Sequence, residues 1–519
     1  MAYRAGELEV LWLKLLAVLE EASWTIVRTS LSPTVRDSFD FGCLMYDASG
    51  HLVAQNTTVA AKIGVFHTLL DRIEEHYPRS SMRPGDIFVT NDPWLTEGHL
   101  YDVSVVMPIF RSTRIVAFVE CIAHLADIGG SLSSTVKDVF GEGLQIPICR
   151  LFDAGNEVPE VVRFIEKNVR VPKLVLADLR ALTASLFVIR DKCMRIMEDH
   201  DLEDFDDLFA EIQLRSERAL RAGIRANLRP GTYVGEVRGD GHTDDGIRLC
   251  LKATVEEEAV QLDFSGSSEQ AAIGINSCFN YSYAWAAFAI RTLTDTSIPN
   301  NAGCFKPVQM FVPPRTIINP LHPAPVRNRA STAHFVPQAI YATLAPAAKK
   351  RIMAESGSPL WVHRIAGRDA EGEPLAGTTL YNGGMGARSG ADGPSAMSFP
   401  TNAGNTPIEV LENWFPIRFV CKELIDGSGG AGRYHGGCGQ RIAFDVLPNA
   451  KLHLLYMHER TKSPARGVLG GEAGRTGKSR KNDVLLPSHG EVDLEGGDRL
   501  ELETPGGGGL GVSGAPCSE

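Results

Sequence analysis

Glycine-rich runs dominate the last third of the chain and constrain its fold more than any other feature of the sequence. They read GGMGARSGADGP, GSGGAGRYHGGCGQ, GVLGGEAGRTGKSRK and PGGGGLG. Glycine allows positive φ angles and close backbone approach without steric cost, so such runs are typical of tight turns between short strands. We therefore predict a strand-and-turn architecture after residues 229–231, interrupted by one helical insert around residues 281–293.

The chain before that point mixes helical and strand patterns. Helical periodicity covers residues 8–29 and then a long stretch from residue 174 to about residue 227. Apolar strands are predicted at residues 103–110 and 115–123, and a hairpin at residues 43–53, where an Asp-Ala-Ser-Gly turn separates two apolar runs. The predicted fold class is α+β: a mixed N-terminal part with a long helical segment, followed by a β-rich, Gly-rich C-terminal part.

Charge, hydropathy and cysteine usage exclude several classes of protein. The 519 residues carry a net charge of -11 and no long basic block, which argues against a nucleic-acid partner. The longest apolar run near the N-terminus, residues 15–19, is too short to span a membrane, and no signal peptide precedes it. Ten scattered cysteines without a CxxC pair indicate a reducing compartment. We expect a cytoplasmic protein without a membrane partner.

Two HxxD motifs carry most of the chemical information. His99 and Asp102 end the segment NDPWLTEGHLYD, and His124 and Asp127 lie in HLADIGG. Each pair adjoins a predicted strand, and a two-stranded hairpin covers the 25 residues between the histidines, so both rings could return to one sheet edge. Two histidines and a carboxylate with open positions suit a divalent transition metal in Lewis-acid chemistry. Residues 1–230 would then form an α+β metal-site domain, and residues 231–519 a β-rich domain that contacts substrate or partner.

Three further segments qualify this interpretation. Asp37 and Asp40 in DSFDFG could add an oxygen ligand, the alternative being a capping or turn role. Arg388, among glycines, could hold a carboxylate or carbonyl group, the alternative being a salt bridge that braces a loop. The stretch GEAGRTGKS resembles a phosphate-binding loop, but its required first glycine falls at Glu472. We therefore do not expect this chain to bind ATP.

Nine stretches in order resemble one protein family, hydantoinase B / 5-oxoprolinase, which includes subunits of acetone and acetophenone carboxylases. They are SFDFGCLMYDASGHLVAQ, GDIFVTNDPWLTEGHLYDVSVVMPIF, AHLADIGG, GEGLQIP, NVRVPKLVLADLRA, IPNNAGCFKP, NGGMGARSGADG, PTNAGNTPIEVLE and PGGGGLG. The resemblance implies a larger A-type (hydantoinase A-like) subunit that binds ATP and Mg²⁺ and phosphorylates the substrate, within a heterotetramer of two A and two B chains. It places the metal ligands on His99, Asp102 and His124, with Asp40 favoured over Asp37 as the acidic ligand. Asp127 would orient a histidine ligand.

The expected function follows from the resemblance together with the metal motif. We expect the metal-bearing subunit of an ATP-dependent cyclic-amide hydrolase that acts on hydantoin, 5-oxoproline or a similar lactam, with one Zn, Mn or Fe ion per site. Asp127 and Arg388 are the expected catalytic contributors. Two alternatives stay open: a subunit of an ATP-dependent ketone carboxylase of the acetone or acetophenone type, and a non-catalytic scaffold of the partner ATPase.

Overall fold

The chain folds into two compact units whose segments alternate along the sequence. The computed structural model describes residues 6–56, 66–241, 245–294, 297–397 and 399–514. The first unit comprises Met1–Gly129, Gly143–Gly223 and Asp295–Val308, and the second comprises Gly130–Glu142, Ile224–Thr294 and Gln309–Glu519. Two segments thus cross the predicted boundary near residue 230, one in each direction.

A seven-stranded antiparallel sheet forms the centre of the first unit, with the strand order β2-β1-β5-β4-β3-β6-β7. Its strands are β1 (Phe41–Tyr46), β2 (Leu52–Gln55), β3 (Ile87–Thr90), β4 (Asp102–Arg111), β5 (Arg114–His124), β6 (Cys149–Asp153) and β7 (Asn156–Glu157). The two predicted apolar strands are β4 and β5, and the predicted hairpin is β1 with β2, so the turn chemistry between these runs was interpreted correctly.

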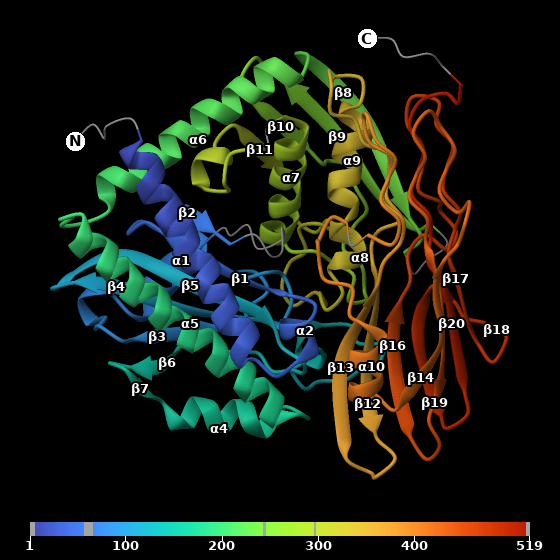
Figure 1. Ribbon diagram of the computed structural model, residues 1–519, viewed down its shortest axis with the longest axis horizontal. Coiled ribbons are helices and arrows are strands. Elements are labelled where there is room, and N and C mark those ends of the chain that lie inside the picture. The colour runs from blue at the N-terminus through green and yellow to red at the C-terminus, as the bar shows by residue number, and fades with distance from the viewer. Residues whose placement is uncertain (1–5, 57–65, 242–244, 295–296, 398, 515–519) are drawn as a thin grey trace. The chain divides into compact units, whose positions relative to one another are not determined.

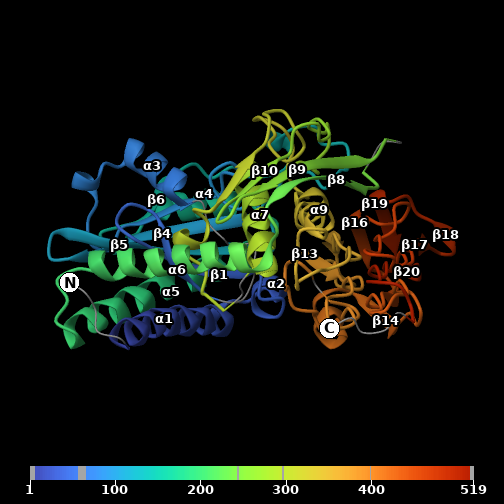
Figure 2. The same ribbon diagram turned by 90° about the horizontal axis from the view of Figure 1, so that it is seen from above.

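Two long helices cover one face of this sheet. Figures 1 and 2 show α1 (Glu7–Thr29) beside α5 (Pro172–Asp199), and Figure 2 shows α3 (Phe66–His76) on the opposite side of the sheet. The inner stripe of α1, which includes Leu8, Leu15 and Ile26, is fully buried. The remaining helices of this region are α2 (Pro33–Arg36), α4 (Pro159–Asn168), α6 (Asp206–Asn227) and the short 3-10 turns η1 (Arg79–Ser81) and η3 (Ala302–Cys304).

The long helical segment that the sequence predicts is interrupted once. It forms α5 and α6, which are separated by residues 200–205, where Asp201 has a positive φ of 51°. A non-glycine residue in this region of φ/ψ space marks a turn, and the acidic stretch around it had been expected to continue the helix. None of the helices that the structure describes is long and apolar enough to cross a bilayer.

The second unit contains three further sheets. One has the order β11-β10-β9-β8 and packs against α9, which in turn packs against α7, as Figure 1 shows. The other two, β13-β12-β16-β19 and β14-β15-β20-β17-β18, share an apolar core that includes Trp361, Phe444 and Tyr456, and α10 closes that core with Leu411. The strands are β8 (Gly231–Gly239), β9 (Ile247–Val255), β10 (Val260–Asp263), β11 (Val308–Phe311), β12 (Trp361–Arg368), β13 (Pro374–Tyr381), β14 (Ile417–Leu424), β15 (Gln440–Val446), β16 (Lys451–Met457), β17 (Lys478–Lys481), β18 (Val484–Leu485), β19 (His489–Glu495) and β20 (Arg499–Glu503), and the helices are α7 (Phe279–Thr294), α8 (Ala330–Ala333), α9 (Phe335–Leu344), α10 (Ile408–Trp414) and the 3-10 turn η2 (Val139–Gly141).

The glycine-rich runs lie against one another as extended segments. We call this arrangement the glycine layer; it comprises residues 354–357, 383–387, 392–394, 428–439, 465–475 and 505–511. Backbone hydrogen bonds join its segments, for example from Gly437 N to Met385 O (2.8 Å) and from Gly507 N to Gly437 O (3.0 Å). Most of its glycines, Gly383 and Gly507 among them, do not have a positive φ. The prediction of tight turns is therefore wrong for these segments, where glycine is needed because neighbouring backbones leave no room for a Cβ atom.

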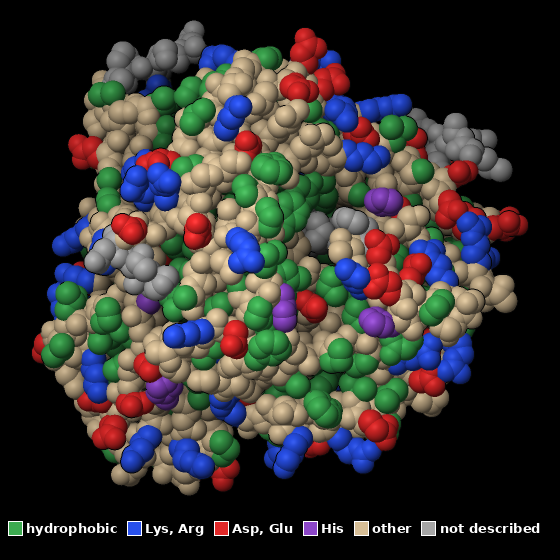
Figure 3. Space-filling view, turned by 180° about the vertical axis from the view of Figure 1, so that it is seen from behind, with side chains coloured by type: hydrophobic (Ala, Val, Ile, Leu, Met, Phe, Trp, Pro, Cys, Tyr) green, Lys and Arg blue, Asp and Glu red, His purple; other side chains and the backbone are tan. Residues whose placement is uncertain are grey.

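The distribution of surface charges and the state of the cysteines agree with what the composition of the sequence indicates. Figure 3 shows one face of the molecule, on which acidic and basic side chains are interspersed rather than gathered by sign. The nine cysteines among the described residues are all free thiols. Cys43 and Cys121 come closest to each other, with 3.7 Å between their Sγ atoms, and both lie buried between the first-unit sheet and α1.

Candidate metal centre

The β4–β5 hairpin brings two of the candidate ligands, Asp102 and His124, together. In its register Asp102, the first residue of β4, lies directly opposite His124, the last residue of β5. Side chains of directly opposed residues in an antiparallel pair point to the same face, with Cβ atoms about 5 Å apart. His99 lies in the loop just before β4, after Gly98, whose φ of 83° is readily accessible only to glycine. Both histidines therefore lie at one edge of the sheet, as the sequence predicts.

Asp40 lies beside the cluster, on the other side of β5 from Asp102. Strand β1 pairs with β5 so that Phe41 lies opposite Ala123, and the backbone N–H of His124 donates to the carbonyl of Asp40 over 3.0 Å. The Asp40 Oδ2 atom is 3.7 Å from His124 Nδ1. Asp37, the alternative acidic ligand, instead ends α2 and pairs with Arg36 at 3.2 Å. The positions therefore favour Asp40.

The donor atoms are close enough to share one ion. His99 Nε2 is 3.1 Å from Asp102 Oδ2, and His124 Nδ1 is 3.5 Å from Asp102 Oδ1. Ligand atoms of these three residues lie within 4.8 Å of one another, and all three side chains are buried. Two imidazole nitrogens with carboxylate oxygens form the mixed set that divalent transition metals accept. The residues present therefore fit a divalent metal.

An aromatic ring supports the cluster. The ring of Tyr101 stacks on that of His124 with centroids 5.2 Å apart, and the His99 ring lies 5.0 Å from His124. The exposed fractions of His99, Asp102 and His124 are 1%, 0% and 6%. Charges this far removed from water interact much more strongly than they do at a surface.

The cluster occupies the face of the sheet turned away from α1. Ser23 Oγ of α1 donates to Cys43 Sγ, and Cys43 lies opposite Cys121 on β5. Because successive side chains of a strand alternate between faces, His124 points to the opposite side from Cys121. Figure 2 shows α3 rather than α1 on that side.

A buried carboxylate that the sequence analysis did not consider lies on the same face. Glu120 accepts hydrogen bonds from the hydroxyl groups of Tyr46 and Ser104, both over 2.6 Å. Burial and the charge of Glu120 raise the pKa of Tyr46 well above its usual value, so the phenol stays protonated. The signal available in the sequence was a single charged residue within the apolar strand at residues 115–123.

Asp127 does not contact a histidine ring in the described structure. Its two carboxylate oxygens accept from the backbone N–H of Arg170 and from the Arg170 guanidinium, the latter over 2.7 Å. The expected hydrogen bond to a histidine ligand is therefore replaced by an ion pair, which fixes the loop after His124 to the segment that leads into α5. A catalytic role for Asp127 stays a prediction.

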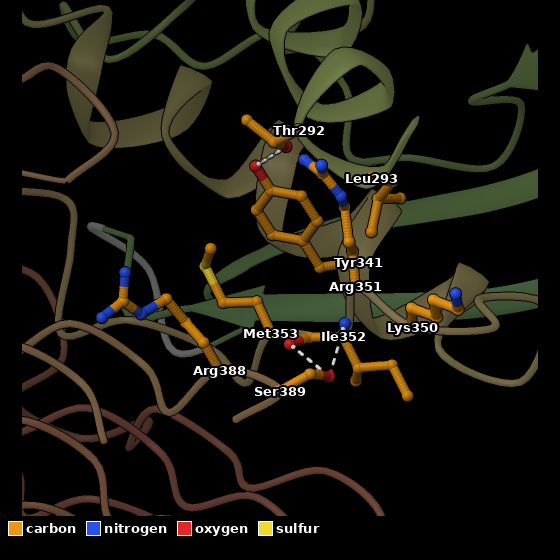
Figure 4. Close-up of a pocket in the computed structure, with 9 residues that line it drawn as sticks. All are labelled: Thr292, Leu293, Tyr341, Lys350, Arg351, Ile352, Met353, Arg388 and Ser389. Carbon is orange, nitrogen blue, oxygen red and sulfur yellow. Dashed lines mark hydrogen bonds between the residues drawn. The ribbon is translucent and has the colours of Figure 1, made fainter. Parts of the chain in front are cut away.

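Arg388 lies in the second unit, beside a cavity of about 310 Å³ that Figure 4 shows. Lys350, Arg351 and Tyr341 also contribute to its lining. The guanidinium of Arg388 donates to the backbone carbonyl of Asp392, and no carboxylate of the described residues lies within 4.0 Å of it. The alternative of a loop-bracing salt bridge therefore finds no support among the described residues, and binding of a substrate oxygen by Arg388 stays a prediction.

Comparisons with known sequences give consistent results along the whole chain. The sequence pattern of the Hydantoinase B/oxoprolinase family matches residues 5–513. An uncharacterized protein of Methanocaldococcus jannaschii is 30% identical over 95% of this chain and 88% of that protein. A Pseudomonas protein named as the B-type subunit of a D-/L-hydantoinase is 26% identical over 95% of this chain and 88% of its own length. A 5-oxoprolinase of Dictyostelium discoideum is also 26% identical, and the chain spans only 39% of that longer protein.

Two solved structures share the fold. The ATP-dependent caprolactamase from Pseudomonas jessenii has a TM-score of 0.91 and 21% identity, covering 99% of this chain and 92% of that one. The nucleotide-free structure of acetone carboxylase has a TM-score of 0.87 and 19% identity, covering 97% of this chain and 75% of that one. These matches confirm the predicted α+β class.

Proposed function

The chain belongs to the hydantoinase B/oxoprolinase family, and from this premise we propose that it is the metal-bearing subunit of an ATP-dependent cyclic-amide hydrolase. The observation that carries the proposal is the buried cluster of His99, Asp102 and His124 at adjacent strand ends, with Asp40 beside it. The proposed substrate is a lactam such as 5-oxoproline, hydantoin or a larger ring.

ATP is needed because an unstrained lactam is a poor electrophile. Phosphorylation of its amide oxygen creates a good leaving group, after which attack at the ring carbon becomes feasible. We assign this phosphorylation to an A-type partner chain, because the one stretch here that resembles a phosphate loop lacks the required glycine at Glu472. The names of three similar proteins, a caprolactamase, a 5-oxoprolinase and a hydantoinase, support the cyclic-amide class.

The residues of this chain would hold and orient the ion. His99 Nε2, His124 Nδ1 and an oxygen each from Asp102 and Asp40 are the proposed ligands. When bound, a divalent metal supplies positive charge that polarises an oxygen atom at the reacting centre. The β4–β5 register holds Asp102 opposite His124, and stacking with Tyr101 holds the plane of the His124 ring. Arg388 is the proposed contact for a carboxylate or carbonyl oxygen of the substrate.

The metal site is tested by elemental analysis of the purified chain. We expect about one Zn, Mn or Fe ion per wild-type chain and its loss in His124→Ala. His453→Ala is the matched control, because His453 belongs to the second unit, pairs with Asp493 at 2.7 Å and is not one of the proposed ligands. Equal metal content in wild type and His124→Ala, with both chains folded by circular dichroism, would show that the cluster is not the site.

The reaction is tested with the reconstituted complex. The chain is combined with an A-type (hydantoinase A-like) subunit and supplied with ATP and a panel of 5-oxoproline, hydantoin and caprolactam, while acetone with ¹³C-bicarbonate is tested in parallel. We expect ring opening coupled to ATP hydrolysis. His124→Ala should lower this activity by more than about 100-fold, which is more than substitution of a residue that only supports a metal ligand typically costs. Incorporation of ¹³C would establish the carboxylase alternative, and full activity in His124→Ala would establish the scaffold alternative.

A further inference from the structure

Helix α1 has two apolar stripes, and only one of them packs against the chain. The inner stripe faces the first-unit sheet and α5. On the outer side, Val10, Leu13 and Trp24 are exposed by 49%, 64% and 52%, and Leu31, just beyond the helix end, by 46%. Figure 2 shows α1 on the outer side of α5 within this unit. A surface helix normally carries one apolar stripe, and contiguous exposed apolar side chains mark an interaction surface.

The spacing of the outer stripe identifies the kind of surface. Its members within the helix are Val10, Leu13, Ala17, Glu20, Trp24 and Val27, so the steps alternate between three and four residues. This is the a/d pattern of a seven-residue repeat, in which side chains insert between those of a facing helix. A helix is therefore the shape that fits the stripe.

We propose that α1 of a second copy of this chain covers the stripe in antiparallel orientation, so that two chains are related by a twofold axis near the middle of the helix. In that register every a position faces a d position. Val10 meets Val27 of the second copy, Leu13 meets Trp24, and Ala17 meets Glu20. A large ring then lies against a mid-sized side chain, and the Glu20 carboxylate lies against the small Ala17 methyl, which leaves it room to reach water. A parallel pair would instead place the two Glu20 carboxylates against each other.

The charges that flank the stripe complement one another in the same register. The flanking positions along one side of the stripe are Glu7, Lys14, Glu21 and Arg28. In the antiparallel pair Glu7 lies beside Arg28 of the second copy, and Lys14 lies beside Glu21. Each pair is formed twice because of the twofold axis, and flanking pairs of opposite charge set partner choice and orientation in helix pairs. This complementarity is the reason for choosing a second copy over an unrelated helix.

Analytical ultracentrifugation of the full chain at micromolar concentration tests the proposal. We expect a dimer for wild type and a dissociation constant raised on the order of 100-fold by Trp24→Glu, because buried aromatic side chains dominate interface energies. Phe164→Glu on α4 is the matched control: Phe164 is a helical aromatic of the same unit, 66% exposed, and lies outside the stripe. A monomeric wild type, or a dimer unchanged by Trp24→Glu, overturns the proposal.

A charge exchange tests the register separately. The exchange is made at Glu7 and Arg28, which leaves the contacts of Lys14 with His200 and of Glu21 with Lys192 within their own chain unchanged. Glu7→Arg and Arg28→Glu each place like charges together in a homodimer and are expected to weaken it, whereas an equimolar mixture of the two variants restores both opposite-charge pairs. Circular dichroism confirms that each variant is folded. Recovery of dimer in the mixture supports the antiparallel pairing, and a mixture no more dimeric than either variant alone overturns it.

Discussion

Replacement of Gly383 by alanine tests whether the glycine layer depends on close backbone approach. A Cβ atom at this position would lie 2.5 Å from the carbonyl oxygen of Gly357 and 2.7 Å from that of Pro505, whereas real Cβ contacts essentially never fall below 3.0 Å. Both neighbours are buried backbone, so neither can rotate away. Moving them strains the hydrogen bonds from Gly384 N to Pro505 O (2.9 Å) and from Gly357 N to Gly384 O (2.8 Å).

The expected magnitude follows from these contacts. Overpacking costs about 1–3 kcal/mol, and each buried backbone hydrogen bond that is lost or weakened costs about 1–3 kcal/mol. We expect Gly383→Ala to lower the free energy of unfolding by roughly 3–6 kcal/mol, a large part of the 5–15 kcal/mol that is typical of a folded domain. Equilibrium unfolding in urea, followed by circular dichroism, measures the change.

Gly427→Ala is the matched control because it separates crowding from backbone conformation. Gly427 has a φ of 67°, but no atom lies within 4 Å of its added Cβ. Its cost should therefore be the left-handed strain alone, about 1–2 kcal/mol. If Gly383→Ala destabilises the chain no more than Gly427→Ala does, then the glycines of the layer are not held by steric exclusion and the reasoning fails.

Two further outcomes are expected from buried groups. Burial lowers the pKa of His334 and of His363 to about 3. Below the ordinary pKa of 6.5 the unfolded chain therefore takes up protons that the folded chain does not, so the free energy of unfolding falls as the pH drops from about 6.5 toward 3, by roughly 2 kcal/mol per histidine at pH 5. The free energy of unfolding is measured by denaturation at pH 7.5 and at pH 5. Its decrease between these two pH values should be smaller in His334→Leu than in wild type, by about this amount. A decrease equal to that of wild type would contradict the assignment. Asp178→Ala should lower the free energy of unfolding by roughly 2–4 kcal/mol, because its buried carboxylate accepts two backbone N–H groups at the junction of α1 and α2, and a thermal unfolding curve like that of wild type would count against this.

The part of the candidate metal centre that depends on pairing between two neighbouring strands could be predicted from the sequence. Two apolar runs joined by a four-residue polar turn specify a hairpin, and the hairpin places Asp102 opposite His124. The choice between Asp37 and Asp40 could not be made in this way. It depends on the pairing of β1 with β5, strands separated by more than sixty residues, and on a turn in which Phe39 adopts a φ of 56°.

Other features depend on contacts that no local pattern encodes. A glycine run has the same kind of sequence whether it forms a turn or packs beside another segment. The two cases differ only in the distance to a backbone segment that is remote in the sequence. Asp127 has the spacing of a residue that orients a ligand, but Arg170, more than forty residues later, takes both of its oxygens. Glu120 was overlooked because a single carboxylate in an apolar strand has no motif, although its burial demands the partners that it finds in Tyr46 and Ser104.

The arrangement of the glycine layer has a consequence for how the chain folds during synthesis. Segment 505–511 accepts hydrogen bonds from three earlier segments, through Gly384 and Ala387, Gly430, and Val468. The ribosome releases this segment after all of them, so the earlier runs can pair with one another but cannot complete their hydrogen bonds until it emerges. Contacts of such large sequence separation close slowly. The second unit should therefore complete its folding late, and during that interval the chain would be most dependent on chaperones.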